Sequence, residues 1–351
     1  MQTIKTAILS FGMSGKVFHA PFIHLHPGYE LATIWERTKS ESIAVYPDIH
    51  IARSLESILD DKSIDLIVVN TPTATHFDYA KKALQANKHV VVEKAFTTTV
   101  DEAIELDRLA TENNKLLSVF QNRRWDSDFQ TVQKVITDGL LGPVHEAEFH
   151  FDRYKEALSS KLHKETAGPG AGLLYDLGPH LIDQAVYLFG MPDAVFADIR
   201  TLRRNSQVDD SIDLLLYYPS IRVRLKSSLL VKEPIPSFIV HGLYGSFIKS
   251  RADIQEAALL AGEKTDQSNW GVEPASEMGL LNTKINGIEE RKKIPTIAGN
   301  YGNYYTRLYD ALTRKGRNPV SAKDGIKVMQ ILEAAIKSNL EKKIIELHHV
   351  A

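Results

Sequence analysis

Two polar residues, four positions apart, stand out in the middle of the chain. Asp176 and His180 share one face if the segment is helical, because residues i and i+4 lie one above the other. A carboxylate one turn from a histidine stabilises the imidazolium, so the pair suits a general base. Pro179 removes a backbone hydrogen bond inside a helix. The segment therefore either kinks there or begins a helix near Gly178.

A third candidate for proton transfer is Lys94. It ends the stretch HVVVEK together with Glu93, directly after apolar residues that predict a buried strand. At the carboxyl end of such a strand a side chain faces the crevice where ligands of open α/β sheets bind. A lysine in that position can donate a proton to a reacting oxygen.

A glycine-rich turn follows the first predicted strand, in SFGMSGKVFHAPF. Ser10, Gly12 and Gly15 occupy the three positions of a GxGxxG turn. A glycine at the second position lets the backbone approach a pyrophosphate, and one at the third lets helix and strand pack closely. Serine at the first position departs from the fingerprint. We expect a dinucleotide site made by Ser10, Gly12, Met13, Ser14 and Gly15.

The second predicted strand ends in IWERTK. The residues at this point decide whether a dinucleotide site prefers NAD or NADP. A carboxylate here accepts hydrogen bonds from the ribose hydroxyls of NAD, whereas Arg or Lys neutralises the 2′-phosphate of NADP. Glu36 argues for NAD, and Arg37 with Lys39 argues for NADP. The sequence predicts NAD or NADP, with NAD preferred because Glu36 would repel a phosphate dianion. Arg37 can stack on the adenine of either cofactor.

Later strands add further predicted cofactor contacts at the same edge of the sheet. The fourth strand ends in VVNTPTATH and the fifth in EKAF. Because the carboxyl ends of parallel strands meet at one edge, we expect these residues to gather there. They are Asn70, Thr71, Pro72, His76, Glu93 and Lys94.

The elements that position these residues alternate between strands and helices. This rhythm is typical of βαβ units and predicts a doubly wound parallel sheet. Thr99 and Glu102 form a capping box that opens a helix ending near Asn113. The expected strands cover residues 3–10, 29–35, 49–52, 64–70, 89–92 and 115–120.

The second part of the chain predicts a different architecture. After a helix at 129–138, strand-like stretches follow one another from Val144 onward, which indicates an antiparallel or mixed sheet. The fold class is thus α/β, with a Rossmann domain over 1–122 and an α+β domain over 123–351 for substrate binding and oligomerisation. Helices are expected at 301–315 and 321–343. One face of this large, mostly antiparallel sheet predicts a homodimer or homotetramer.

Composition excludes several classes of function. Lys plus Arg number 42 and Asp plus Glu 44, giving a formal charge of -2, so no net field favours nucleic acid or an anionic membrane. The absence of cysteine removes disulfides and thiolate-bound zinc. No metal is expected, since the pairs His24/His26 and His348/His349 lack carboxylate company. Without a signal or membrane-spanning stretch, we expect a cytoplasmic protein.

Four motifs carry a family resemblance over essentially the whole chain. SFGMSGKVFHAPF, NTPTATH, EKAF and GLLYDLGPHLIDQA resemble, in this order, the glucose-fructose oxidoreductase and inositol dehydrogenase family, written Gfo/Idh/MocA. SVFQNRRWDSDFQ, HFDRY and LYDLGPHLIDQAVYLFGMP are similar to its subgroup with scyllo-inositol dehydrogenases. The resemblance implies a catalytic trio of Lys94, Asp176 and His180. The usual EKP is EKA here, so Ala95 replaces a rigid proline.

The resemblance also implies a reaction. Hydride would pass between a nicotinamide cofactor and a cyclic polyol or sugar resembling scyllo-inositol, with His180 taking the hydroxyl proton. Two alternatives stay open: a reductase of a keto-sugar, anhydro-sugar or sugar acid, and a non-catalytic NAD(P)-sensing regulatory protein, which needs no acid–base residues. The expected substrate contacts are Lys94, Asn122, Arg123, Tyr154, Asp176 and His180.

Overall fold

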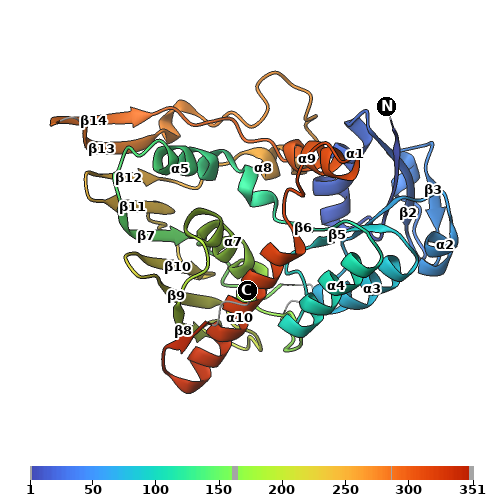
Figure 1. Ribbon diagram of the computed structural model, residues 1–351, viewed down its shortest axis with the longest axis horizontal. Helices are drawn as coiled ribbons and strands as arrows, with labels where there is room; N and C mark the ends of the chain where they lie inside the picture. The colour runs from blue at the N-terminus through green and yellow to red at the C-terminus, as the bar shows by residue number, and fades with distance from the viewer. Residues whose placement is uncertain (1, 160–164, 286, 348–351) are drawn as a thin grey trace. The chain divides into compact units, whose positions relative to one another are not determined.

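A computed structural model describes residues 2–159, 165–285 and 287–347. The chain forms two compact units (Figure 1). The first unit consists of Met1–Asn122, Gln255–Ser268 and Asn300–Ile326, and the second of Arg123–Ile254, Asn269–Gly299 and Lys327–Ala351. The sequence predicts a first domain that ends at residue 122. The first unit also includes the two later segments, which that prediction assigns to the second domain.

Buried polar contacts explain why the chain returns to the first unit. The Tyr29 hydroxyl donates a hydrogen bond to the carbonyl of Tyr305 at 3.0 Å, and the Val119 amide donates to the carbonyl of Val320 at 3.1 Å. Tyr305 is fully buried. Hydrophobic periodicity locates a helix at this point but does not say which core buries it.

The sheet of the first unit has six parallel strands in the order β3-β2-β1-β4-β5-β6, as the sequence predicts for a doubly wound fold. The central strands β4 and β5 are buried on both faces, hence their continuous apolar runs. The strand order reverses between β1 and β4, where ligands of such sheets bind. The strands are β1 (Ile4–Ile8), β2 (Tyr29–Trp35), β3 (His50–Ala52), β4 (Leu66–Val69), β5 (His89–Glu93) and β6 (Leu117–Phe120).

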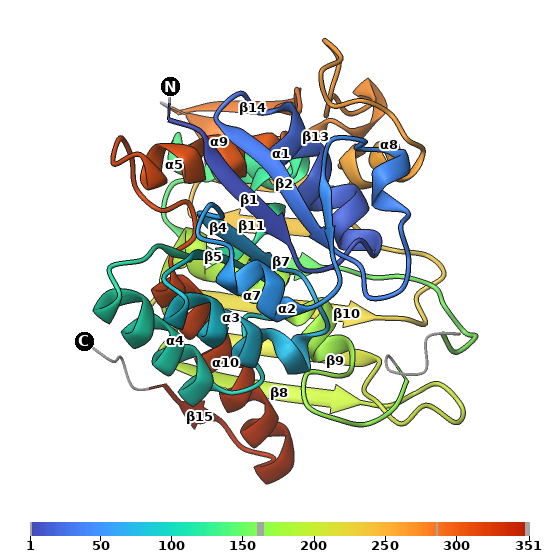
Figure 2. The same cartoon turned by 90° about the vertical axis from the view of Figure 1, so that its right-hand side faces the viewer.

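Helices connect these strands. The predicted capping box is present: Thr99 accepts a hydrogen bond from the Glu102 amide, and the Glu102 carboxylate accepts one from the Thr99 amide. In Figure 2, α3 and α4 lie side by side. The helical elements are η1 (Gly15–His19), α1 (Ala20–Leu25), η2 (Ser42–Ala44), α2 (Leu55–Asp60), η3 (Thr73–Thr75), α3 (His76–Gln85), α4 (Val100–Glu112), α8 (Gln255–Leu260) and α9 (Gly302–Leu312).

The second unit contains a nine-stranded sheet in the order β14-β13-β12-β11-β7-β10-β9-β8-β15. Only the pairing of β7 with β10 is parallel among those recorded, so the predicted mixed, mostly antiparallel sheet is confirmed. The strands are β7 (Val144–His150), β8 (Ala194–Arg200), β9 (Ser211–Tyr217), β10 (Arg222–Ser228), β11 (Phe238–Gly242), β12 (Gly245–Lys249), β13 (Gly279–Ile285), β14 (Ile288–Ile294) and β15 (Ile345–Glu346).

Three of these strands, β13, β14 and β15, are not predicted by the sequence pattern. The sequence of β14, IEERKKI, carries five charged residues between two isoleucines, and its side chains are exposed or half-buried. Because this strand lies at the edge of the sheet, it needs no apolar face, and charge there hinders pairing with other chains. The period-2 pattern that reveals a half-buried strand is therefore missing.

Helices cover one face of the nine-stranded sheet and close a common core with it (Figure 1). The core includes Phe149, Phe238 and Phe247, which are fully buried. Among the described residues, no helix is both long and apolar enough to cross a lipid bilayer. The remaining helical elements are η4 (Asn122–Trp125), α5 (Ser127–Thr137), α6 (Leu173–Asp176), α7 (Gly178–Phe189), η6 (Ala275–Glu277) and α10 (Ala322–Glu341).

Candidate active site

The glycine turn lies between β1 and η1, as predicted. A Cβ added at Gly15 would lie 2.0 Å from the Ser10 carbonyl oxygen, so only glycine fits here. The Ser10 hydroxyl accepts a hydrogen bond from the Gly12 amide at 3.1 Å. Serine at the first position therefore stabilises the turn itself. Met13, next in the turn, is 47% exposed.

Asn70 connects this turn to the end of β4. Its side-chain nitrogen donates to the Ser10 carbonyl at 2.9 Å and to the Ser14 hydroxyl at 3.3 Å. Its side-chain oxygen is buried and, within the described chain, accepts no hydrogen bond. Gly12 is exposed, and an added Cβ there would meet only Ser10 within 4 Å. A bound dinucleotide fits here for two reasons: the space beside Gly12 is open, and the hydroxyls and amide of the cofactor are donors that the Asn70 side-chain oxygen can accept.

His76 has a structural position inside the fold. It is buried, with Nδ1 2.8 Å from the Ala95 carbonyl oxygen and Nε2 2.8 Å from the Thr71 carbonyl oxygen. Burial lowers the pKa of His76. The ring thus connects the loop after β4 to the loop after β5, and Pro72 caps η3 in the loop after β4. The Lys94–Ala95 peptide bond is cis.

The carboxylate of Glu36 is occupied by its own loop. One oxygen accepts the Glu41 amide at 3.0 Å, and the other accepts the Ser42 amide at 3.0 Å and the Ser42 hydroxyl. Burial would raise the pKa of Glu36, but these hydrogen bonds hold it below its usual value. Glu36 therefore caps the start of η2. The sequence predicts a different role for it, a contact with the ribose of the cofactor. Arg37 and Lys39 are exposed on the same loop.

Lys94 follows β5 at the carboxyl edge of the first unit's sheet. Its amide donates to the Glu93 carboxylate at 3.1 Å. The other Glu93 oxygen lies 2.9 Å from Nε2 of His19, which is fully buried. The sequence analysis missed His19, because a histidine four residues after a glycine turn has no distinctive pattern.

Asp176 and His180 belong to two consecutive helices of the second unit. Asp176 ends α6, and α7 begins at Gly178 with Pro179 in its first turn. This is one of the two arrangements that the sequence left open, and it suits proline, whose missing amide needs no partner there. His180 is buried and Asp176 is half-buried.

A tight turn fixes the start of α6. Gly172 has φ of 93°, and an added Cβ would lie 2.0 Å from the Asp209 carboxylate. That carboxylate accepts a hydrogen bond from the Leu174 amide at 2.7 Å. Burial raises the pKa of Asp209 to about 6. Asp209 thus satisfies an amide at the helix start that would otherwise lack a partner.

Phe151 gathers cationic groups near His180. The two rings have centroids 6.5 Å apart. The guanidinium carbons of Arg123, Arg153 and Arg251 lie 5.5, 5.1 and 4.3 Å from the Phe151 centroid. Within this unit Arg123 also forms an ion pair with Asp126 at 3.5 Å.

The neighbouring Arg124 has a different task. It makes two hydrogen bonds to Asp183, of 2.8 and 2.7 Å, and both side chains are buried. Such a bidentate pair anchors η4 to α7. Asn122, the last residue of the first segment of the first unit, is also buried.

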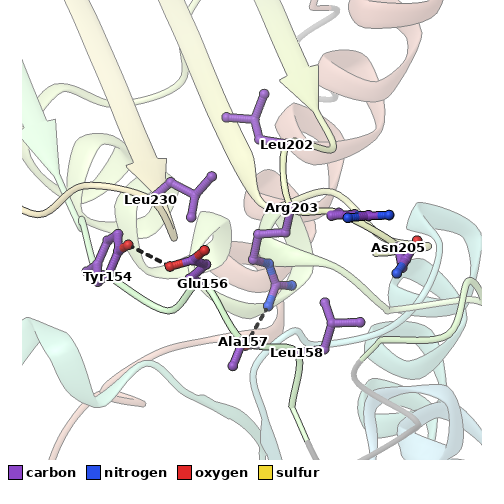
Figure 3. A pocket seen from close by; sticks show the side chains of 9 residues that line it. Tyr154, Glu156, Ala157, Leu158, Leu202, Arg203, Asn205 and Leu230 are labelled. Atoms are coloured by element: carbon purple, nitrogen blue, oxygen red, sulfur yellow. Dashed lines mark hydrogen bonds between the residues drawn. The ribbon is translucent and has the colours of Figure 1, made fainter.

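Tyr154 belongs to a separate pocket of the second unit (Figure 3). This pocket has a volume of about 620 Å³, and Arg203 and Leu202 are among its lining residues, but the predicted acid–base residues are not. The Tyr154 hydroxyl donates to Glu156 at 2.9 Å. Lys94 belongs to the first unit and Asp176 and His180 to the second, so the trio remains a prediction. His348 and His349 lie outside the described residues.

Comparison with known proteins assigns both parts of the chain. Residues 4–121 match the model of the oxidoreductase family's NAD-binding Rossmann fold, and residues 133–347 match that of its C-terminal alpha/beta domain. The chain is 42% identical to the oxidoreductase YdgJ of Escherichia coli, covering 95% of this chain and 96% of that protein.

Two further relatives cover nearly the full length. The chain is 37% identical to the scyllo-inositol 2-dehydrogenase (NADP(+)) IolW of Bacillus subtilis, over 99% of this chain and 97% of that protein. The crystal structure of an oxidoreductase from Bacteroides fragilis superposes with a TM-score of 0.91 at 47% identity, covering 99% of this chain and 100% of that chain. The resemblance read from the motifs is thereby confirmed, and the chain belongs to the Gfo/Idh/MocA family of NAD(P)-binding oxidoreductases.

Proposed function

We propose that this protein oxidises a ring secondary alcohol of a cyclic polyol or sugar, reversibly, with Lys94, Asp176 and His180 as its acid–base group. The observation that carries the proposal is the position of Lys94. It directly follows β5 at the carboxyl edge of the sheet that also carries the glycine turn. In doubly wound sheets this edge is where a dinucleotide and its substrate meet.

The residues have distinct roles in this reaction. When bound, the nicotinamide cofactor accepts or returns the hydride. His180 takes the proton of the substrate hydroxyl, and Asp176 orients the imidazole and stabilises its protonated form. The Lys94 ammonium donates a hydrogen bond to the oxygen on which negative charge develops. The proposal requires the three groups to meet at one carbon of the substrate.

NADP(H) is the cofactor that the loop after β2 supports. Each oxygen of Glu36 accepts an amide of its own loop, and the carboxylate is buried there. Arg37 and Lys39 are exposed there, although Lys39 pairs with Glu41 at 2.7 Å. Arg53 donates to the carbonyl of Glu36 at 2.8 Å. Exposed guanidinium and ammonium groups suit a 2′-phosphate. The relative IolW carries NADP(+) in its name.

A panel of inositols, sugars and keto-sugars, run with NADP and NAD in both directions, tests the proposal. We expect turnover on at least one cyclic polyol or sugar. Lys94→Ala should lower kcat by about 10²- to 10⁴-fold, the usual worth of a positioned acid or base. Cofactor affinity, measured by titration, should stay the same.

The control is Lys82→Ala, which removes an exposed lysine from α3. It should keep full activity. Full turnover by Lys94→Ala would remove Lys94 from the mechanism. Tight NADP(H) binding with no turnover on any member of the panel would instead favour a sensing role.

A further inference from the structure

Three buried residues of the first unit form a continuous chain of hydrogen bonds that ends at Lys94. The Tyr305 hydroxyl oxygen lies 2.6 Å from Nδ1 of His19, and Nε2 of His19 lies 2.9 Å from one oxygen of Glu93. The other oxygen of Glu93 accepts the Lys94 amide at 3.1 Å. His19 and Tyr305 have no exposed surface. Such an arrangement is costly to bury unless every member is satisfied.

The chemistry of the partners fixes the direction of these bonds. An ionised carboxylate only accepts, so Nε2 of His19 carries the proton that is shared with Glu93. When the ring is neutral, Nδ1 is an acceptor, and the Tyr305 hydroxyl donates a hydrogen bond to it. Burial raises the pKa of Tyr305 well above its ordinary value, so this hydroxyl keeps its proton.

The charge of Glu93 depends on this arrangement. Burial alone would raise the pKa of Glu93, but the hydrogen bond from His19, together with nearby positive charge, holds the pKa below its usual value. The carboxylate therefore stays ionised inside the unit. Without the His19 donor, a buried carboxylate would lose a charge-assisted hydrogen bond and shift its position or its protonation.

Aromatic packing holds the members in place. The His19 ring lies 4.4 Å from the ring of Phe120 on β6, measured between centroids. The Tyr305 ring stacks on Phe22 with centroids 6.4 Å apart. Tyr29 donates a hydrogen bond to the Tyr305 carbonyl. The relay therefore connects η1, β5 and α9, three segments that are remote in the sequence, through groups with little freedom to rotate.

We propose that Tyr305, His19 and Glu93 form a positioning relay that fixes the backbone of Lys94 and thereby aims its ammonium group. The inference rests on the proposed function, in which Lys94 contacts the reacting oxygen. The three residues act through Lys94 and touch no reacting atom. A displacement of about 1 Å at a catalytic group can cost about 10²-fold in rate, so a relay of this kind governs kcat more than binding.

Hydrogen exchange at the Lys94 amide tests the relay without any turnover. In Tyr305→Phe and His19→Leu we expect this amide to exchange at least about 10-fold faster, because its acceptor Glu93 is no longer held. His19→Gln keeps a donor for Glu93 and should restore part of the protection. Unchanged exchange in Tyr305→Phe and His19→Leu would overturn the relay.

Steady-state kinetics provide the second arm. Tyr305→Phe and His19→Leu should lower kcat by about 10- to 100-fold, with the KM of the cofactor changed by less than about 3-fold. Partial recovery of kcat is expected in His19→Gln. Loss confined to KM, or no loss of kcat, would also overturn the relay.

Tyr309→Phe is the matched control. Tyr309 lies one turn beyond Tyr305 on α9, is 5% exposed, and donates to the carbonyl of Gln2 at 2.8 Å. Loss of this buried hydroxyl removes one hydrogen bond, as Tyr305→Phe does, but should leave kcat and the exchange of the Lys94 amide unchanged. An active Lys94→Ala variant or an inactive wild type would contradict the proposed function. The exchange experiment tests the relay in either case, because it needs no turnover.

Discussion

At the scale of single residues, the structure shows two carboxylates that serve the backbone. Glu36 accepts two amides of its own loop, and Glu93 accepts the amide of Lys94. A carboxylate can accept several hydrogen bonds, and backbone donors nearby compete well with any ligand. Among the charged groups of the loop after β2, Lys39 pairs with Glu41, and Arg37 presents an exposed guanidinium. This guanidinium is the basis for proposing NADP(H).

The variant Arg37→Ala tests the proposed preference for NADP(H). Removing one charge-assisted contact to a phosphate should weaken NADPH binding by about 10- to 100-fold, in line with the roughly 1.5–3 kcal/mol such bonds contribute. NADH binding should change by less than about 3-fold, because NADH has no 2′-phosphate. Isothermal titration calorimetry with both cofactors measures the difference.

The control is Arg108→Ala, which removes a surface ion pair with Glu112 on α4. It should affect neither cofactor. Equal affinity of the wild type for NADH and NADPH, or an Arg37→Ala variant that binds NADPH as tightly as the wild type does, would contradict the assignment.

At the scale of elements, the break between α6 and α7 sets the position of the predicted base. Gly172 adopts a left-handed conformation and leaves room for the Asp209 carboxylate, which caps the start of α6. Pro179 opens α7 one turn later. Asp176 and His180 thus lie on either side of a break in the helix, since proline in a helix interior removes a backbone hydrogen bond and clashes with the preceding turn.

Asp209 should make the stability of this element depend on pH. Its pKa is raised from 3.8 to about 6 in the folded chain, so the folded state holds a proton that the unfolded chain releases near pH 4. The stabilising contribution is complete below pH 4 and is lost as pH rises to about 6. At about 1.4 kcal/mol per pKa unit, the loss amounts to about 3 kcal/mol.

Urea unfolding of wild type and Asp209→Asn between pH 4 and pH 7 measures this contribution. Asparagine keeps an acceptor for the Leu174 amide but does not titrate. The free energy of unfolding of the wild type should therefore fall relative to that of Asp209→Asn as pH increases. Parallel curves for the two proteins would show that Asp209 titrates normally.

At the scale of the whole molecule, the nine-stranded sheet has one face in the core and a second face of mixed character. On β9, Leu214 and Leu216 are fully buried, while Leu215 between them is half-buried on the opposite face. Phe196 of β8 is its cross-strand partner. Side chains alternate between faces along a strand, so these two residues give the outer face an apolar area.

We predict that this face pairs with a second copy of the chain to give a dimer or tetramer. Leu215→Glu places a charge in the apolar area and should shift the protein to monomers, because burying an unpaired charge is costly. Sedimentation velocity at micromolar concentration measures the change, and circular dichroism checks that the fold is kept. A monomeric wild type would contradict the prediction.

The sequence by itself determined the doubly wound domain and the place of its ligand edge. Hydrophobic periodicity, the turn at Gly12 and Gly15, and the capping box at Thr99 are local signals, each contained within a dozen or so residues. Because parallel strands end at a common edge, residues far apart in sequence, such as Asn70 and Lys94, could be assigned to it without a structure.

Only the tertiary structure decided which partners these side chains take. The contact between His19 and Tyr305 spans 286 residues, and no local pattern records it. The segment that carries Tyr305 belongs to the first unit rather than to the second. Hydrogen bonding is directional and short-ranged, so the choice between a ligand and the protein's own backbone, as at Glu36, depends on distances of about 3 Å that exist only once the chain is folded.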